Sequence, residues 1–213
     1  MKYLALLGGT FNPPHIGHIN PALSAISSLG INKLGLMPCR LPPHKAGPDI
    51  SDAHRVNMVE LTCQTDDRLY PELVELTLPV PSYTVKTLRH LRQTNPDTAI
   101  CFLIGSDSLY NLPSWYEWQS LLNYCHLVVL QRDADASAYS DILTPWLNAH
   151  QCANLAALSE KPSGNIWVTD TPRCPVSSTE IRAHLAHSGP DSEVSQWLAP
   201  QVVDYIKQNG LYA

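Results

Sequence analysis

The chain has 213 residues, of which 44% are hydrophobic and 15% are charged, and its formal net charge is −5. This composition excludes a disordered chain, because it supplies enough apolar material for the core of one α/β domain. The negative charge excludes broad contacts with nucleic acid or an anionic membrane, so any phosphate site must be local. No apolar stretch approaches the ~20 residues of a membrane span, and Gly8 ends the first apolar run too early for a signal peptide. We therefore expect a cytoplasmic protein.

The start of the chain predicts a βαβ unit. An apolar run at residues 3–7 ends in glycine at Gly8 and is typical of a buried strand that enters a tight turn. Apolar residues then recur at helical spacing over 18–29, with Pro21 expected in the first helical turn, where proline is tolerated. A second apolar run at 33–37 predicts the next strand, so the two strands should be parallel.

The rest of the chain alternates between strands and helices in the same way. Ser51 and Ser82 can each cap a helix, and the first of these helices should run to about Gln64. Further extended segments are predicted at 69–78, 99–104, 127–130 and 166–168, and further helices at 115–124, 141–150, 178–186 and 200–208. The polar region 133–163 is the least regular part of the chain and is interpreted as an insertion.

This alternation predicts an α/β fold, a Rossmann-like, doubly wound and mainly parallel sheet flanked by helices. The absence of a long linker or an internal repeat indicates a single domain over residues 1–213. Ligands in such folds bind at the carboxyl ends of the strands, near the point where the strand order reverses. No two of the six cysteines form a C-x-x-C pair, which predicts free thiols and no protein-bound metal site.

The segment that follows the first predicted strand has the composition of a phosphate site. It reads Gly8-Gly9-Thr10-Phe11-Asn12-Pro13-Pro14-His15-Ile16-Gly17-His18 and leads into a helix. Glycines let the backbone approach phosphates closely, and a helix start presents N–H groups and the positive end of the helix dipole. Because His15 and His18 are three residues apart, both should face the same side and stabilise charge on phosphate oxygens in a transition state.

A second segment near the far end of the chain also opens a predicted helix. It reads Ser177-Ser178-Thr179-Glu180-Ile181-Arg182. Hydroxyl and N–H groups there can hold the β- and γ-phosphates of a nucleotide, and Arg182 can neutralise their charge. The same residues are also typical of a helix N-cap with a purely structural role, in which Glu180 is the capping-box residue.

Together the two segments resemble the signatures of the H-x-G-H nucleotidyltransferases. Four further features are similar to the bacterial nicotinate-nucleotide adenylyltransferases: Pro42-Pro43-His44-Lys45, Pro81-Ser82-Tyr83-Thr84, Gly105-Ser106-Asp107-Ser108 and Trp115-Tyr116. The resemblance spans roughly residues 3 to 210. It implies the transfer of AMP from ATP to nicotinate mononucleotide in NAD biosynthesis, giving deamido-NAD and pyrophosphate, with Mg²⁺ as cofactor. It implies ATP and nicotinate mononucleotide as partners and is compatible with a homo-oligomer.

The resemblance also implies a role for each matching residue. The residues that would bind ATP are Gly8, Gly9, Thr10, Phe11, His15, His18, Gly105, Asp107, Ser177, Ser178, Thr179 and Arg182, with His15, His18 and Arg182 as the catalytic residues. Asp107 would bind ribose hydroxyls. The residues that would bind the acceptor nucleotide are Asn12, His44, Lys45, Ser82, Tyr83, Thr84, Trp115, Tyr116 and Arg132. The indole of Trp115 would stack on the pyridine ring.

Position 12 departs from the family pattern, since Asn12 stands where the family often has Asp. An amide cannot act as a base or as a charged metal ligand, but it can make a hydrogen bond in a turn. Mg²⁺ would then be held chiefly by phosphates and water. The acceptor phosphate is already largely anionic at pH 7, so the reaction needs neither a general base nor a covalent enzyme intermediate.

Several structural alternatives accompany these roles. Trp115 can be a core residue together with Trp118, Asp107 can be a helix cap, His44-Lys45 can be a solvated loop tip, and Pro81-Ser82-Tyr83-Thr84 can be an ordinary helix start. Alternative functions are an adenylyltransferase for nicotinamide mononucleotide or pantetheine phosphate, a cytidylyltransferase, or a non-catalytic nucleotide sensor. An NAD-dependent oxidoreductase is excluded, because the turn lacks the G-x-G-x-x-G pattern.

Overall fold

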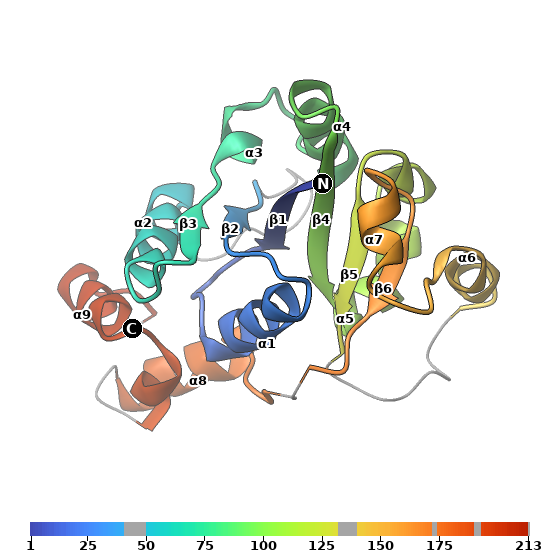
Figure 1. Cartoon of the computed structure of the whole chain (residues 1–213). Helices are drawn as coiled ribbons and strands as arrows, with labels where there is room; N and C mark the ends of the chain where they lie inside the picture. The colour runs from blue at the N-terminus through green and yellow to red at the C-terminus, as the bar shows by residue number, and fades with distance from the viewer. Residues whose placement is uncertain (41–49, 132–139, 172–173, 190–192, 213) are drawn as a thin grey trace.

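The computed structural model describes residues 1–40, 50–131, 140–171, 174–189 and 193–212 (Figure 1). These residues contain one sheet. Its strands are β1 (Lys2–Gly9), β2 (Leu34–Pro38), β3 (Leu69–Pro71), β4 (Thr98–Gly105), β5 (His126–Leu130) and β6 (Ile166–Val168). Across the described ranges, none of the helices is both long enough and apolar enough to cross a membrane.

Helices connect and cover these strands. The α-helices are α1 (Ile16–Ser28), α2 (Asp52–Cys63), α3 (Val74–Thr77), α4 (Thr84–Thr94), α5 (Ser106–Tyr110), α6 (Leu143–His150), α7 (Ala157–Glu160), α8 (Ser178–Ser188) and α9 (Pro200–Asn209). Short 3₁₀-helices are η1 (Leu112–Ser114), η2 (Trp118–Asn123) and η4 (Glu193–Trp197).

The strand order in the sheet is β3-β2-β1-β4-β5-β6, and each of these neighbouring pairs is parallel. The chain therefore builds outward from β1 in one direction and then returns to add β4 on the other side. This arrangement confirms the predicted doubly wound sheet and places the reversal of strand order between β1 and β4.

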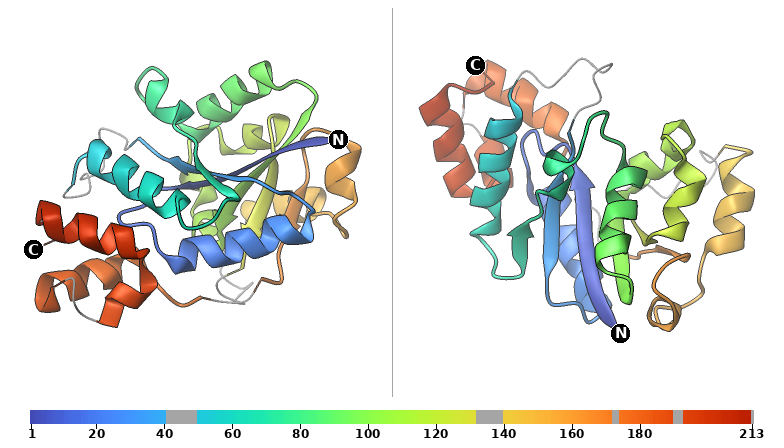
Figure 2. Two further views of the ribbon diagram at one scale, coloured as in Figure 1. Left: turned by 60° about the vertical axis from the view of Figure 1, so that its left-hand side comes forward. Right: turned by 90° about the horizontal axis from the view of Figure 1, so that it is seen from above.

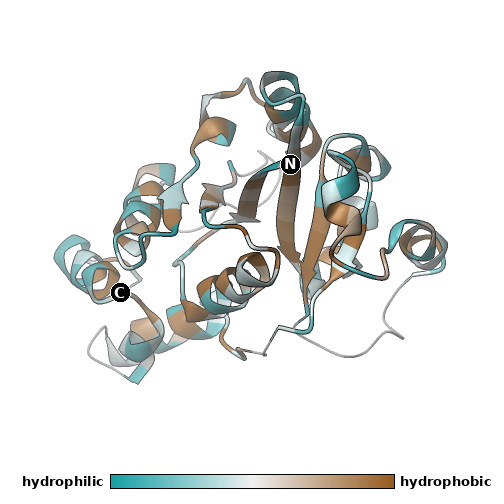
Figure 3. Ribbon diagram, in the orientation of Figure 1, coloured by the Kyte–Doolittle hydropathy of each residue, from teal (hydrophilic) through white to brown (hydrophobic). Residues whose placement is uncertain are grey.

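Helices cover both faces of the sheet (Figures 1 and 2). One core packs α1 residues such as Ala22 and Ile26 against one face, and another packs α4 residues such as Leu88 against the opposite face. A third core joins α2, α8 and α9 beside the sheet. Figure 3 shows the matching pattern, with hydrophobic strands inside and hydrophilic outer surfaces on the helices.

The predicted extended segment at 69–78 is wrong beyond its first residues. Strand β3 ends at Pro71, whose ring nitrogen cannot donate a ladder hydrogen bond. Glu72 Oε1 then accepts from Val74 N at 3.1 Å and starts the single turn of α3. The predicted cap of α4 is also wrong, because the N-cap is Tyr83 and the Ser82 hydroxyl donates to Glu75 instead.

Two further boundaries differ from the sequence prediction. The helix expected from residue 115 starts only at Trp118, because Glu117 has a φ of 49° and a helix cannot run through this left-handed conformation. Helix α1 starts at Ile16, since the carbonyl of His15 already accepts from His18 N at 2.9 Å. Pro21 therefore lies in the second turn of α1, where its missing N–H removes a helical hydrogen bond.

Candidate active site

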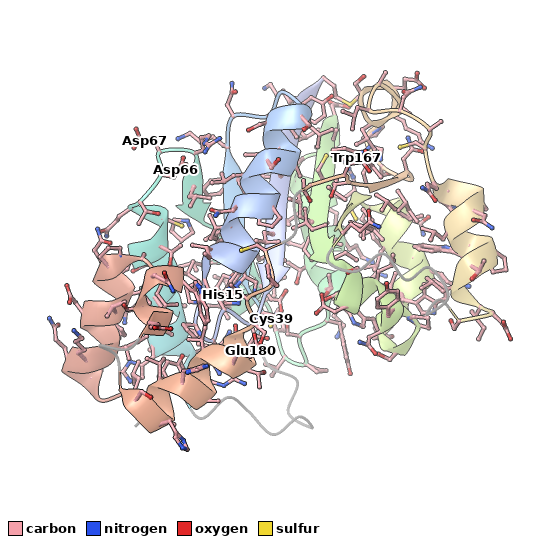
Figure 4. All side chains as sticks on the ribbon, turned by 90° about the horizontal axis from the view of Figure 1, so that it is seen from below. His15, Cys39, Asp66, Asp67, Trp167 and Glu180 are labelled. Carbon is pink, nitrogen blue, oxygen red and sulfur yellow. The ribbon has the colours of Figure 1, made fainter. Side chains whose placement is uncertain are left out.

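The candidate site lies where β1 and β4 end. β1 ends at Gly9 and leads to α1 on one face, whereas β4 ends at Gly105 and leads to α5 on the other. Figure 4 shows the labelled side chains of His15, Cys39 and Glu180 gathered at this end of the sheet, with Asp66 and Asp67 at the opposite end. A ligand between the two diverging loops would touch both halves of the fold.

The loop between β1 and α1 brings two imidazoles together. His15 is the extended N-cap of α1, and its ring is buried and centred 3.7 Å from the ring of His18. The rings of His18 and Phe11 are in turn T-shaped, with their centres 5.4 Å apart. Phe11 is itself buried and has a φ of 51°. The two imidazoles therefore lie together at the start of α1, as the three-residue spacing predicted, although His15 is the N-cap and not part of the first turn.

Gly17 lets the start of α1 lie directly against the segment before α8. A Cβ atom at this position would approach Val176 O to 2.8 Å and His15 Nδ1 to 2.9 Å. Both distances are shorter than real Cβ contacts, so any side chain at position 17 would displace one of these two groups. The glycine of H-x-G-H is thus required by a close approach between two segments distant in the chain.

Helix α8 holds the same loop through two hydrogen bonds. Ser178 Oγ donates to the carbonyl of Pro13 at 3.1 Å, and an Arg182 terminal nitrogen donates to the carbonyl of Asn12 at 2.8 Å. Arg182 also donates to Thr179 Oγ1 at 3.3 Å. The two signature segments, near opposite ends of the sequence, therefore form one structural unit.

Ser177 serves as the N-cap of α8. Its Oγ accepts from Glu180 N at 3.2 Å, and the Glu180 carboxylate accepts from Ser177 N at 3.2 Å, which completes a capping box. The cap suggested by the sequence is therefore confirmed. It also fixes the direction of the α8 N-terminus, whose dipole favours an anion.

Asn12 is a buried turn residue. Its Oδ1 accepts from the Tyr212 hydroxyl at 2.6 Å, and the bond to Pro13 is cis. Burial raises the pKa of Tyr212, so this hydroxyl stays a proton donor at neutral pH. The amide at position 12 thus makes the turn hydrogen bond that its chemistry allows.

Arg55 supports the glycine-rich loop by a hydrogen bond to its main chain, and no sequence pattern singles this residue out. Its guanidinium is fully buried and donates to Thr10 O at 2.8 Å and to Asp52 Oδ1 at 2.7 Å. Thr10 Oγ1 lies 3.7 Å from Cys39 Sγ, and Cys39 N donates to Gly9 O at 2.9 Å. Burial raises the pKa of the Cys39 thiol, although Thr10 and Arg55 partly oppose this, so the thiol stays protonated.

On the other side, the starts of α4 and η2 approach each other. The rings of Tyr83 and Tyr116 stack at 4.5 Å, and Thr84 is the first residue of α4. Lys86 Nζ lies 5.1 Å from the centre of the Tyr83 ring. Trp115 is partly buried and packs against the core beneath α4. It can therefore be a core residue and still present part of its indole to a ligand.

The remaining predicted residues fall into two groups. Gly105 is the N-cap of α5, and Asp107 is an exposed residue in its first turn, so Asp107 is not the cap itself. His44, Lys45 and Arg132 lie outside the described residues. Within the described part of the chain, no cluster of three or more His, Cys, Asp and Glu side chains could hold a metal ion.

Solved structures of other proteins share this fold. The nicotinic acid mononucleotide adenylyltransferase of Plasmodium falciparum, complexed with NaAD, superimposes with a TM-score of 0.75 at 19% identity and covers 100% of this chain and 98% of its own. A putative nicotinate-nucleotide adenylyltransferase from Vibrio parahaemolyticus gives 0.64 at 17% identity, over 100% and 96%. At these identities the likeness establishes the fold alone.

Sequence comparison reaches further. The cytidylyltransferase-like family model matches residues 6–184. A probable nicotinate-nucleotide adenylyltransferase of Aeromonas salmonicida (strain A449) is 42% identical over 210 residues, 98% of this chain and 96% of the relative. One of Shewanella baltica (strain OS223) is 42% identical over 217 residues, 98% of both chains. Because such relatives match nearly the whole length, the chain belongs to the nicotinate-nucleotide adenylyltransferases of the cytidylyltransferase-like family.

Proposed function

We propose that the chain transfers the AMP part of ATP to nicotinate mononucleotide, giving deamido-NAD and pyrophosphate in NAD biosynthesis. The observation that carries this proposal is that Ser178 and Arg182 of α8 hydrogen-bond to the loop that bears the histidines. This contact lies where the strand order reverses. The names of the 42% identical relatives support nicotinate mononucleotide as the acceptor. The Plasmodium neighbour solved with NaAD is consistent with it.

The chemistry is a single displacement at phosphorus. An oxygen of the acceptor phosphate forms a new bond to the α-phosphorus of ATP. The bond from that phosphorus to the oxygen bridging to the β-phosphorus breaks, and pyrophosphate leaves with the electron pair. Since the acceptor phosphate has its second pKa near 6, it needs no general base. The protein must align two anions and stabilise the leaving group.

The phosphate half of the site would be formed by α1, α8 and the loop before α1. His15, His18 and the Thr10 hydroxyl line this loop, and both helices direct their positive dipole ends toward it. Arg182 holds the carbonyl of Asn12 and brings its positive charge to the same place. We assign these groups to the ATP phosphates and Asp107, at the end of β4, to a ribose.

Magnesium would enter with ATP. The described residues provide hydroxyl and imidazole groups here but no carboxylate cluster, a donor set that fits an ion bound mainly through phosphate oxygens and water. When bound, Mg²⁺ neutralises the phosphates and polarises the leaving pyrophosphate. The residues of the chain then orient the phosphates and exclude water.

The acceptor half would lie between the starts of α4 and η2. Thr84, Tyr83 and the Trp115-Tyr116 pair are held there by the tyrosine stack, and an aromatic wall of this kind suits a pyridine ring. We assign the acceptor phosphate to His44, Lys45 and Arg132.

All six cysteines are free thiols, which fits a cytoplasmic enzyme that uses ATP.

Pyrophosphate release tests this function. The assay contains ATP and Mg²⁺ with nicotinate mononucleotide, nicotinamide mononucleotide or phosphopantetheine in parallel. We expect the highest kcat/KM with nicotinate mononucleotide. A preference for another acceptor would keep the phosphate assignments and overturn those of Thr84, Trp115 and Tyr116. Tight ATP binding without pyrophosphate release would indicate a nucleotide sensor.

A further inference from the structure

One buried carboxylate joins the phosphate half of the site to the acceptor half. Glu75 lies in α3 and is only 3% exposed. Its Oε1 accepts from Arg40 N at 3.1 Å and from Ser82 Oγ at 2.9 Å, and its Oε2 accepts from Thr87 Oγ1 at 3.2 Å. These three donors come from the segment after β2, the segment before α4, and α4 itself.

The first donor connects Glu75 to the phosphate half. Arg40 follows Cys39, whose N–H donates to Gly9 O at the end of β1. The Arg40 guanidinium donates in turn to Leu76 O at 2.7 Å and to Leu78 O at 3.3 Å, at the end of α3. The exit of β2 is therefore tied to α3 through both the main chain and the side chain of Arg40.

The other two donors connect Glu75 to the acceptor half. Ser82 and Thr87 lie on either side of Tyr83, the N-cap of α4, and both donate to the same carboxylate. Their bonds fix where α4 begins and so where the Tyr83 ring stacks on Tyr116. A change at Glu75 would therefore move the tyrosine stack relative to the end of β1.

Stability alone gives no reason to place a carboxylate here. Burial raises the pKa of Glu75 above its usual range, while hydrogen bonds from Ser82, Arg40 and Thr87 and the charge of Arg55 oppose that rise. An apolar group of similar volume often costs less to bury than a charge. The three convergent donors from separate segments indicate that geometry is what this side chain provides.

We propose that Glu75 is a positioning residue for the acceptor: it fixes the Tyr83–Tyr116 wall at its working distance from the phosphate loop. The inference rests on the proposed function. It predicts that loss of Glu75 raises KM for the acceptor more than KM for ATP, because two of its three bonds, from Ser82 and Thr87, position the acceptor wall, whereas only the bond from Arg40 N leads toward the phosphate loop.

The test measures KM for each substrate in pyrophosphate release by Glu75→Ala, Glu75→Gln and Ser82→Ala. We expect Glu75→Ala to raise KM for nicotinate mononucleotide about tenfold, the scale of one or two lost hydrogen bonds, with KM for ATP changed less than twofold. Glu75→Gln should restore most of the affinity, since its amide oxygen can still accept from Arg40 N and Ser82 Oγ. Ser82→Ala should shift KM in the same direction by less.

Glu72→Gln is the matched control. Glu72 lies three residues away and accepts only from Val74 N among the bonds described for it, so both KM values should stay as in the wild type. Thermal unfolding of each variant identifies any that fails to fold. If Glu75→Ala fails to fold, Ser82→Ala, which removes one bond to Glu75, decides the question. Equal changes in both KM values, or none in Ser82→Ala and folded Glu75→Ala, would overturn the inference. A wild type without turnover would overturn the proposed function with it.

Discussion

His18 is the single residue whose loss should most clearly separate chemistry from folding. Its ring is held between His15 and Phe11 at the start of α1. We expect His18→Ala to lower kcat by about 10²–10³-fold, the usual effect of removing one donor to developing charge. Circular dichroism should show an intact fold. His187→Ala, at the exposed end of α8, is the control. Turnover of His18→Ala within a few-fold of the wild type would remove this role.

The Tyr212 hydroxyl holds the loop that carries the histidines, and its removal tests whether this bond supports turnover as well as stability. Tyr212→Phe removes the donor to Asn12 Oδ1 and leaves a buried amide oxygen unsatisfied, which should destabilise the fold by about 1–3 kcal/mol. Because the Asn12 carbonyl also holds Arg182, turnover should fall as well. Urea unfolding and pyrophosphate release measure the two effects.

Tyr205→Phe is the matched control for that experiment. The Tyr205 hydroxyl lies 2.8 Å from His54 Nδ1 and accepts from Asn57 Nδ2 at 3.0 Å, between α2 and α9. Its loss should also reduce stability but leave kcat unchanged. If both variants lose stability and neither loses turnover, the bond between Tyr212 and Asn12 has only a structural role.

At the scale of elements, His126 at the start of β5 should make the stability of the fold sensitive to acid. The ring is fully buried, with Nε2 at 2.9 Å from Lys161 O and Nδ1 accepting from Asn165 N at 3.1 Å. Burial lowers the pKa of His126, and the positive charges of Lys161 and Arg92 act in the same direction, while the bond to Lys161 O opposes them. The neutral ring is therefore the folded form.

The sign of the pH effect follows from linkage. Since the unfolded chain binds the proton more tightly than the folded one, the stability due to His126 is present above pH ~6.5 and is lost as the pH falls below it. We expect the free energy of unfolding in urea to drop between pH 7.5 and 5.5. The drop should be smaller in His126→Gln. An equal drop in both proteins would mean that another group controls the acid response.

The elements that sequence patterns predicted well are those whose residues are buried on both faces. After their polar first residues, β1, β4 and β5 are formed by apolar runs, because each strand lies inside a parallel sheet covered by helices. The one-turn helix α3 was missed because its stability comes from contacts distant in sequence. Arg40 donates to Glu75 from 35 residues away.

The same limit applies to the candidate site. The two signature segments could be recognised because their glycines, histidines and hydroxyls are consecutive in the chain. Arg55 and Tyr212 could not, since each resembles any other residue of its type until the fold brings it to its partner. Arg55 reaches Thr10 across 45 residues, and Tyr212 reaches Asn12 across 200.

At the scale of the whole molecule, α2 joins the core on the α1 side of the sheet to the core that contains α8 and α9. Val59 packs with α1 against the sheet, whereas its neighbour Met58 packs with α8 and α9. One helix therefore contributes consecutive residues to two cores. The hydrogen bonds from Ser178 and Arg182 to the loop after β1 add a second connection. Among the described residues, the core that contains the C-terminal helices α8 and α9 also contains Met58 of α2.

We therefore expect the chain to unfold as a single cooperative domain. Its tryptophans report on different regions: Trp115, Trp118 and Trp146 pack on the α4 side of the sheet, Trp167 on the α1 side, and Trp197 beside α8 and α9. Urea midpoints from far-ultraviolet circular dichroism and from tryptophan fluorescence should coincide, also in a variant that keeps Trp197 as its one tryptophan.

An earlier midpoint for Trp197 would contradict this prediction and would have a functional consequence. It would mean that α8 and α9 detach before the sheet unfolds, taking Ser178 and Arg182 away from the histidine loop. ATP, if it binds across both segments, should then raise the Trp197 midpoint more than that of the sheet. In a single cooperative domain, ATP should raise both midpoints equally, because the phosphate site exists only when the two ends of the chain are assembled.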